Sequence, residues 1–158
     1  MVPPGNYQVR LTVGSDWSKT EHLEVLIDPR IETDGVTQQD LEQQAELGLL
    51  VRDAITESRS AVSRLGAARK SLEGKSDAAS KDADARLAEI QKRLVTGPVR
   101  YDMPMVADQL QYLNGMINTA DQKLGRDAFE RYEELKVALD SIVADLEGVL
   151  AHIETGGS

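Results

Sequence analysis

The last third of the sequence carries an unbroken helical stripe of apolar residues. Their spacing alternates between three and four, at Ala128, Tyr132, Leu135, Leu139, Ile142, Leu146, Val149 and Ile153. Such spacing places all of them on one face of an α-helix. Each Leu, Ile or Val that leaves water contributes roughly 1.5–3 kcal/mol, but only if another element covers the stripe. The sequence therefore predicts a long final helix packed against neighbouring helices.

A second long helix is predicted from Thr37 to Leu72. Thr37 suits the N-cap, Asp40 suits the first turn, and Gly74 suits the stop. Its apolar stripe comprises Leu41, Leu47, Val51, Ala54, Ile55, Ala61, Val62, Leu65, Ala68 and Leu72. A helix of this length is typical of a bundle.

Two shorter helices are predicted between these long ones. The first follows a loop at Gly74–Ser80 and closes at Gly97-Pro98, with Ala83, Leu87, Ile90 and Leu94 on one face. The next runs from Asp102 to Ala120, with Pro104 in its first turn. Its apolar face comprises Val106, Leu110, Leu113 and Ile117, and a turn at Asp121–Gly125 follows.

Three glycines, Gly48, Gly115 and Gly148, lie inside predicted helices. Glycine within a helix costs about 1 kcal/mol relative to alanine. Close approach of two helices would offset that cost, whereas a kink or a tolerated surface position would not. Both interpretations remain open, and close packing is favoured less for Gly148 than for the other two.

The first thirty residues have a period of two, which indicates strands. Tyr7, Val9, Leu11 and Val13 alternate with polar residues, and Leu23, Val25 and Ile27 do so after a turn near Gly14-Ser15-Asp16. Pro3-Pro4-Gly5 and Asp28-Pro29 bound the two strands. The predicted fold is therefore mainly α, a four-helix up-down bundle preceded by an antiparallel β-hairpin. Residues 1–30 form the hairpin, 31–155 the bundle and 156–158 a flexible tail.

A two-stranded hairpin is marginal by itself in water, because both of its edges stay open. Three arrangements would complete it: packing across the bundle, forming the last hairpin of a β-sandwich, or pairing with another copy. The segment Pro4-Gly5-Asn6-Tyr7 favours the end of an immunoglobulin-like sandwich, where a tyrosine commonly begins a strand.

Composition excludes several classes of partner. The chain has 27 acidic and 18 basic residues, a net charge of −9, which argues against a phosphate backbone and against anionic membranes. No apolar run approaches the roughly 20 residues that span a bilayer. Cysteine is absent, which excludes disulfides and thiol chemistry. The first residues lack the features of a signal peptide. The expected partner is protein, either an upstream domain or a second copy.

No catalytic, cofactor or metal site is predicted. The two histidines, His22 and His152, are interpreted as a surface strand residue and as a complement to a helix C-terminus. No glutamate precedes a histidine by three residues, which argues against a di-metal bundle site. Carboxylate pairs occur at Glu133-Glu134, Asp82 with Asp84, and Asp127 with Glu130. Such pairs serve glycoside hydrolysis, but on helical polar faces they are ordinary surface neighbours. Phosphate-binding glycine motifs are missing.

Several segments together resemble a known family. The segments that carry the resemblance occur in this order: Pro4-Gly5-Asn6-Tyr7-Gln8-Val9-Arg10-Leu11-Thr12-Val13, Leu23-Glu24-Val25, Asp28-Pro29-Arg30, a helix that opens with Asp40-Leu41, Leu113-Asn114-Gly115-Met116 and Ala120-Asp121. They resemble the C-terminal region of bacterial sortilin-like proteins with a β-propeller of Asp-box (BNR) repeats, often labelled glycosyl-hydrolase-like. Lys123-Leu124-Gly125-Arg126 departs from the proline-containing helix start usual there.

The resemblance implies that the propeller lies upstream and that the protein is exported. No enzyme residue is carried over, since the matching positions are turn and packing residues. The chain is therefore expected to be a non-catalytic accessory or interaction module of a larger bacterial protein. Self-association through the hairpin is part of this expectation. The alternatives are part of a carbohydrate-active hydrolase, and a helical scaffold that binds a partner helix.

Overall fold

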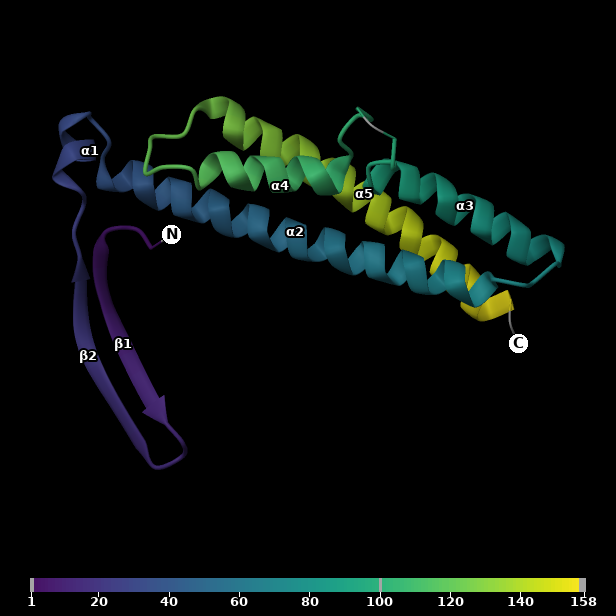
Figure 1. The fold of residues 1–158 in the computed structure, drawn as a ribbon, viewed down its shortest axis with the longest axis horizontal. Helices are drawn as coiled ribbons and strands as arrows, with labels where there is room; N and C mark the ends of the chain where they lie inside the picture. The colour runs from purple at the N-terminus through teal and green to yellow at the C-terminus, as the bar shows by residue number, and fades with distance from the viewer. Residues whose placement is uncertain (1, 100, 157–158) are drawn as a thin grey trace.

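The chain folds into a hairpin and a set of long helices that extend from one end of it (Figure 1). The computed structural model describes residues 2–99 and 101–156. The predicted fold class is confirmed: an N-terminal antiparallel hairpin precedes a mainly helical bundle. Of the predicted tail, Gly156 is the last residue of the final helix, and 157–158 lie outside the described residues.

The hairpin pairs β1 (Gly5–Val13) with β2 (Trp17–Val25). Tyr7 stands opposite Leu23, and Val13 stands opposite Trp17. The second strand ends at Val25, two residues before the predicted Ile27. Val25 pairs with Gly5, which is the first residue of β1. Pro4 precedes Gly5 and has no N–H to donate, so the ladder of hydrogen bonds ends there.

A short helix, α1 (Pro29–Thr33), follows the hairpin and was not predicted. The Asp28 carboxylate accepts a hydrogen bond from the Arg30 backbone N–H at 2.9 Å, and Pro29 occupies the first helical position. Aspartate as N-cap and proline at the next position are a helix start signal. Asp28-Pro29 was interpreted only as a strand stop, so this second meaning was missed.

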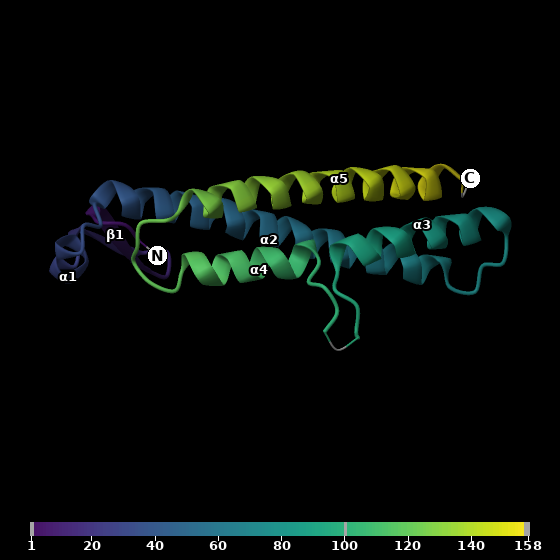
Figure 2. The same ribbon diagram turned by 90° about the horizontal axis from the view of Figure 1, so that it is seen from above.

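Four long helices form the bundle: α2 (Gln38–Leu72), α3 (Ala78–Leu94), α4 (Val106–Ile117) and α5 (Arg126–Gly156). Most residues of the predicted stripes meet in one core, in which Leu47, Leu87, Leu110, Leu139 and Leu146 are almost wholly buried. Val62, which was predicted to belong to the stripe of α2, is exposed instead. Figure 2 shows that α3 and α4 follow one another along the same line. Each of them packs against both α2 and α5. The two shorter helices thus share one position in the bundle.

The helix starts follow their caps. Thr37 and Asp40 form the capping box that begins α2, since Thr37 Oγ1 accepts from the Asp40 N–H and the Asp40 carboxylate accepts from the Thr37 N–H. The fourth helix begins at Val106, so Pro104 precedes it and does not lie in its first turn as predicted. Met105 offers no capping side chain, and its N–H donates instead to Thr96 Oγ1 at 2.9 Å.

The end of α4 is held by Gln44, a fully buried residue of α2. Its Nε2 donates to the carbonyls of Ile117 and Ala120 at 2.6 and 2.7 Å, and its Oε1 accepts from the Gln122 N–H at 3.2 Å. One amide therefore supplies partners to backbone groups that the helix end leaves unpaired. The helix stops at Ile117, three residues before the predicted Ala120.

The helical glycines do not mark close helix packing at two of the three positions. A Cβ added at Gly115 or Gly148 would have no atom within 4 Å. At Gly48 the nearest atom would be Ile117 Cγ2 at 3.9 Å, an ordinary van der Waals distance. Of the two interpretations left open by the sequence, the surface position therefore holds for Gly115 and Gly148, which are exposed.

Ion pairs join the helices along the bundle surface. Arg64 of α2 binds Glu147 of α5 through two bonds of 2.5 and 2.6 Å. Arg93 of α3 reaches Asp145 of α5 at 2.5 Å. Among the described residues, no helix is both long and apolar enough to cross a bilayer.

Candidate functional site

The hairpin has two chemically different faces. We use the name hairpin face for the side that carries Tyr7, Val9, Leu11, Val13, Trp17 and Leu23, with Lys19 and Glu21 between them. The opposite side carries only polar side chains, among them Gln8, Arg10, Thr12, Ser18, Thr20 and His22. An antiparallel sheet with this division normally buries its apolar side.

None of the residues that the structure describes covers the hairpin face. Val9, Leu11 and Val13 are 51%, 60% and 61% exposed, and Trp17 and Leu23 are 48% and 47% exposed. The two strands pack on each other and on none of the described helices, as Figure 1 shows. A contiguous apolar surface of this kind marks an interaction site.

The start of β1 is pinned by one side chain. The Tyr7 hydroxyl donates to the Pro3 carbonyl, four residues upstream, at 2.6 Å, and this bond is partly buried. The bond closes the chain around Pro4 and Gly5, where Gly5 adopts φ 157°. This hydrogen bond therefore helps to fix the conformation in which the first strand begins.

Two opposite charges interrupt the hairpin face on β2. Lys19 Nζ lies 2.6 Å from the Glu21 carboxylate, and the two side chains are 64% and 66% exposed. Inward-pointing charges on a strand discourage uncontrolled edge pairing. The apolar row of β1 has no such interruption.

A second candidate surface is the groove between α4 and α5, a hollow of about 550 Å³. Pro104, Tyr112, Leu113, Met116 and Ala128 supply its apolar lining, and Tyr112 is 72% exposed. Asp108, Asp127 and Arg131 also line this groove. The Thr96 hydroxyl donates to Asp108, and Arg131 binds Glu134 at 2.7 Å.

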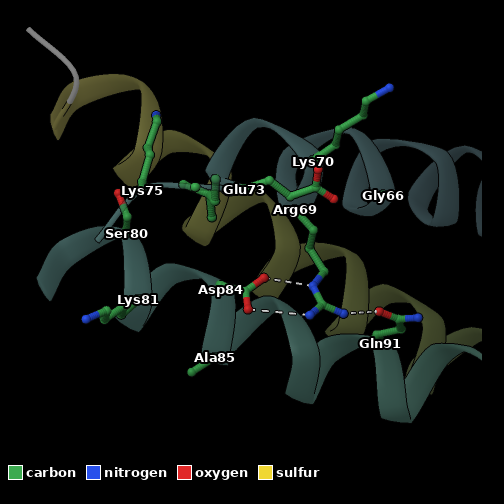
Figure 3. Close-up of a pocket in the computed structure, with 12 residues that line it drawn as sticks. Gly66, Arg69, Lys70, Glu73, Lys75, Ser80, Lys81, Asp84, Ala85 and Gln91 are labelled. Carbon is green, nitrogen blue, oxygen red and sulfur yellow. Dashed lines mark hydrogen bonds and ion pairs between the residues drawn. The ribbon is translucent and has the colours of Figure 1, made fainter. Parts of the chain in front are cut away.

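A third hollow, of about 670 Å³, lies between the end of α2 and α3 (Figure 3). Arg69 spans it, with Nε 2.8 Å from Asp84 Oδ1 and Nη1 2.7 Å from Gln91 Oε1. The hydrogen bonds from Arg69 lower the pKa of Asp84. A glycosidic general acid needs a raised pKa instead. The Lys70, Lys75 and Lys81 side chains point away from one another, so they form no cradle for an anion (Figure 3).

The carboxylates and histidines singled out in the sequence do not come together. His22 is exposed on the polar side of the hairpin, and His152 is exposed one turn before the end of α5. Glu130 binds Arg126 at 2.6 Å, and Glu133 and Glu134 lie exposed on α5. In the parts of the chain that the structure describes, no three His, Asp or Glu side chains gather closely enough to hold a metal ion.

Comparison with protein-family models, with curated proteins and with solved structures finds no match to this chain.

Proposed function

We propose that this chain is a non-catalytic interaction module, in which the bundle is a rigid support and the hairpin face docks on a second β-sheet, either of a larger protein or of another copy of this chain. The exposed apolar side of a hairpin that touches no helix is the observation that carries the proposal. Two strands alone bury too little surface for stability in water. A partner sheet packed about 10 Å away would cover the hairpin face and leave the polar side in solvent.

The Tyr7 hydrogen bond supports a sandwich as the form of this docking. Immunoglobulin-like sandwiches use a tyrosine near the start of a strand whose hydroxyl bonds to the backbone a few residues upstream. Tyr7 and Pro3 have this relation. The resemblance to the C-terminal region of exported bacterial Asp-box proteins agrees with the proposal, since an accessory module of such a protein needs no catalytic residue of its own.

Site-specific photo-crosslinking in the source cells tests the proposal. A benzoylphenylalanine at Leu11, on the hairpin face, is expected to crosslink to one defined polypeptide or to an upstream segment of the same gene product. The matched control is the neighbouring Thr12, which points to the opposite side. Equal crosslinking from both positions, or none from Leu11, would contradict docking through this face.

A second candidate function is binding of a partner helix in the groove between α4 and α5. The apolar lining by Tyr112, Met116 and Ala128 favours it, because amphipathic helices bind in such grooves through apolar anchors. Benzoylphenylalanine at Tyr112 would crosslink to a partner segment in that case. The control position is Gln111, the preceding residue of α4, which is exposed and does not line the groove.

A carbohydrate-active function would rest on the groove as well, since Asp108 and Asp127 are the two carboxylates that line it. If the chain hydrolysed glycosides, Asp108→Asn and Asp127→Asn would each abolish that activity. An assay of the purified chain and of both variants on β- and α-linked oligosaccharides measures the turnover. We expect no turnover above that of the two variants.

A further inference from the structure

We infer that the hairpin face docks on the hairpin face of a second copy of this chain, and that two chains thereby form a four-stranded, two-layer sandwich around a two-fold axis. This inference rests on the proposed function, since it names the occupant of the same surface. It is carried by the order of residues along the two strands.

The register of the hairpin makes its face self-complementary. An axis that lies between the two sheets, perpendicular to the strands at the level of Arg10 and Thr20, reverses the strand direction of the second copy. It then places β1 over β1 and β2 over β2 of the two chains. Val9 of one copy meets Leu11 of the other, and Tyr7 meets Val13.

The charges on β2 obey the same symmetry. Lys19 and Glu21 lie on either side of Thr20, so the axis sets Lys19 of one copy over Glu21 of the other. Beyond them Trp17 meets Leu23. Each positive charge therefore faces a negative charge across the contact, and each apolar side chain faces an apolar one.

The charge distribution allows two chains to approach at the hairpin. The chain as a whole carries −9, which opposes contact between two bundles. Residues 5–25 contain two basic and three acidic residues, so the hairpin is nearly neutral. It also projects away from the bundle, which keeps the two acidic bundles apart (Figure 1).

The contact is small, and its affinity is correspondingly low. Five apolar side chains per copy, each about half exposed, give a contact near the lower limit of ~1,000 Å² for specific interfaces. Contacts at this lower limit are typically weak and transient, and we take a dissociation constant on the order of 10 μM as the expected value.

Sedimentation equilibrium on the full chain, with Trp17 emission followed in parallel, tests the inference. Trp17 is the single tryptophan of the chain, so its emission reports on the hairpin alone. We expect reversible dimerisation, with a blue shift of Trp17 over the same concentration range. Leu11→Lys abolishes both, whereas Thr12→Lys on the polar side leaves both unchanged.

Charge variants test the arrangement of the two copies. Lys19→Glu and Glu21→Lys each place like charges opposite one another and weaken dimerisation about tenfold or more. An equimolar mixture of these two variants restores the dimer, because each chain then supplies the charge that the other needs. Neither variant retains the Lys19–Glu21 pair within its own chain, so a purely local role of that pair predicts no rescue. The double variant Lys19→Glu with Glu21→Lys dimerises like the original chain.

Three results would overturn the inference. If the chain stays monomeric up to about 500 μM, some fiftyfold above the expected dissociation constant, a second copy does not occupy the hairpin face. If Leu11→Lys still dimerises, the dimer forms through another surface. If the mixture of Lys19→Glu and Glu21→Lys chains does not restore the dimer, the two copies are arranged differently. A monomer in which Leu11 still crosslinks to a different polypeptide leaves the proposed function standing and refutes only this inference.

Discussion

The bundle and the hairpin are built from similar apolar patterns and reach opposite outcomes. In the bundle every predicted stripe finds a partner stripe from the same chain, and residues such as Leu87 and Leu139 are wholly buried. In the hairpin an equally regular row, from Val9 to Val13, stays in solvent. A periodic pattern determines which side of an element is apolar, but burial also requires a second element to cover it. None of the described elements covers the hairpin face. Under the proposed function, this difference distinguishes the supporting bundle from the docking surface.

The largest expected effect is a loss of stability on mutation of the bundle core, which mutation of the hairpin should not cause. Leu139→Ala removes a fully buried side chain and is expected to lower the free energy of unfolding by about 2–5 kcal/mol. Leu11→Ala, at a position that is 60% exposed, changes it by less than about 0.5 kcal/mol in dilute solution. Urea titration followed by circular dichroism at the helical band measures both. Equal losses would mean that the hairpin is part of the core.

Unfolding followed by two probes sharpens the same comparison. Helical circular dichroism reports on the bundle, and Trp17 emission reports on the hairpin. Because no described helix contacts the strands, we expect the Trp17 transition of the monomer at a lower urea concentration than the helical one. Coincident transitions would show that both regions unfold as one unit.

The next largest expected loss of stability follows removal of the buried side-chain amide of Gln44. Gln44→Ala leaves the carbonyls of Ile117 and Ala120 without their donor and lowers stability by about 1–3 kcal/mol. The control is Gln43→Ala, an exposed neighbour on the same helix, for which we expect a change within about 0.5 kcal/mol. Amide exchange should also rise at Asn118–Gln122 in the Gln44 variant alone.

The effect of Tyr7→Phe should be smaller and confined to the hairpin. The variant keeps the ring and loses the hydrogen bond to Pro3, which contributes about 0.5–1.5 kcal/mol. The Trp17 transition shifts to lower urea, and the helical transition does not move. A shift of the helical transition would show a coupling between the regions that the structure does not contain.

The sequence predicted the hairpin, the four helices of the bundle and most of the core, because each depends on a periodic pattern or on a local cap such as Thr37 with Asp40. It did not predict the end of α4 or the shared position of α3 and α4. These depend on contacts between distant residues, and Gln44 meets Ile117 across 73 positions of the chain. The short helix α1 did have a local signal in Asp28-Pro29. The uncovered hairpin face is tertiary information too, since the sequence left open whether the bundle covers it.

The smallest expected effect is a pH dependence at the capping box. Hydrogen bonds from Thr37 lower the pKa of Asp40 below its ordinary value of 3.8. A carboxyl whose pKa is lower in the folded state adds stability above its ordinary pKa, and that contribution is lost as the pH falls through the lowered value. The stability difference between the original chain and Asp40→Asn should therefore shrink below about pH 4. A difference that stays constant from about pH 6 to 2 would contradict the assignment.

The length of α2 sets a distance between the two ends of the molecule. Its 35 residues at a rise of about 1.5 Å each extend about 50 Å, and α5 runs beside it for most of that length. The pairs of Arg64 with Glu147 and of Arg93 with Asp145 brace the half of this rod that is remote from the hairpin. The start of α2, which lies beside the base of the hairpin, is therefore about 50 Å from the turn between α2 and α3. Under the proposed function the bundle acts as a spacer, and lengthening its helices by whole turns would move the hairpin end of the molecule farther from that turn.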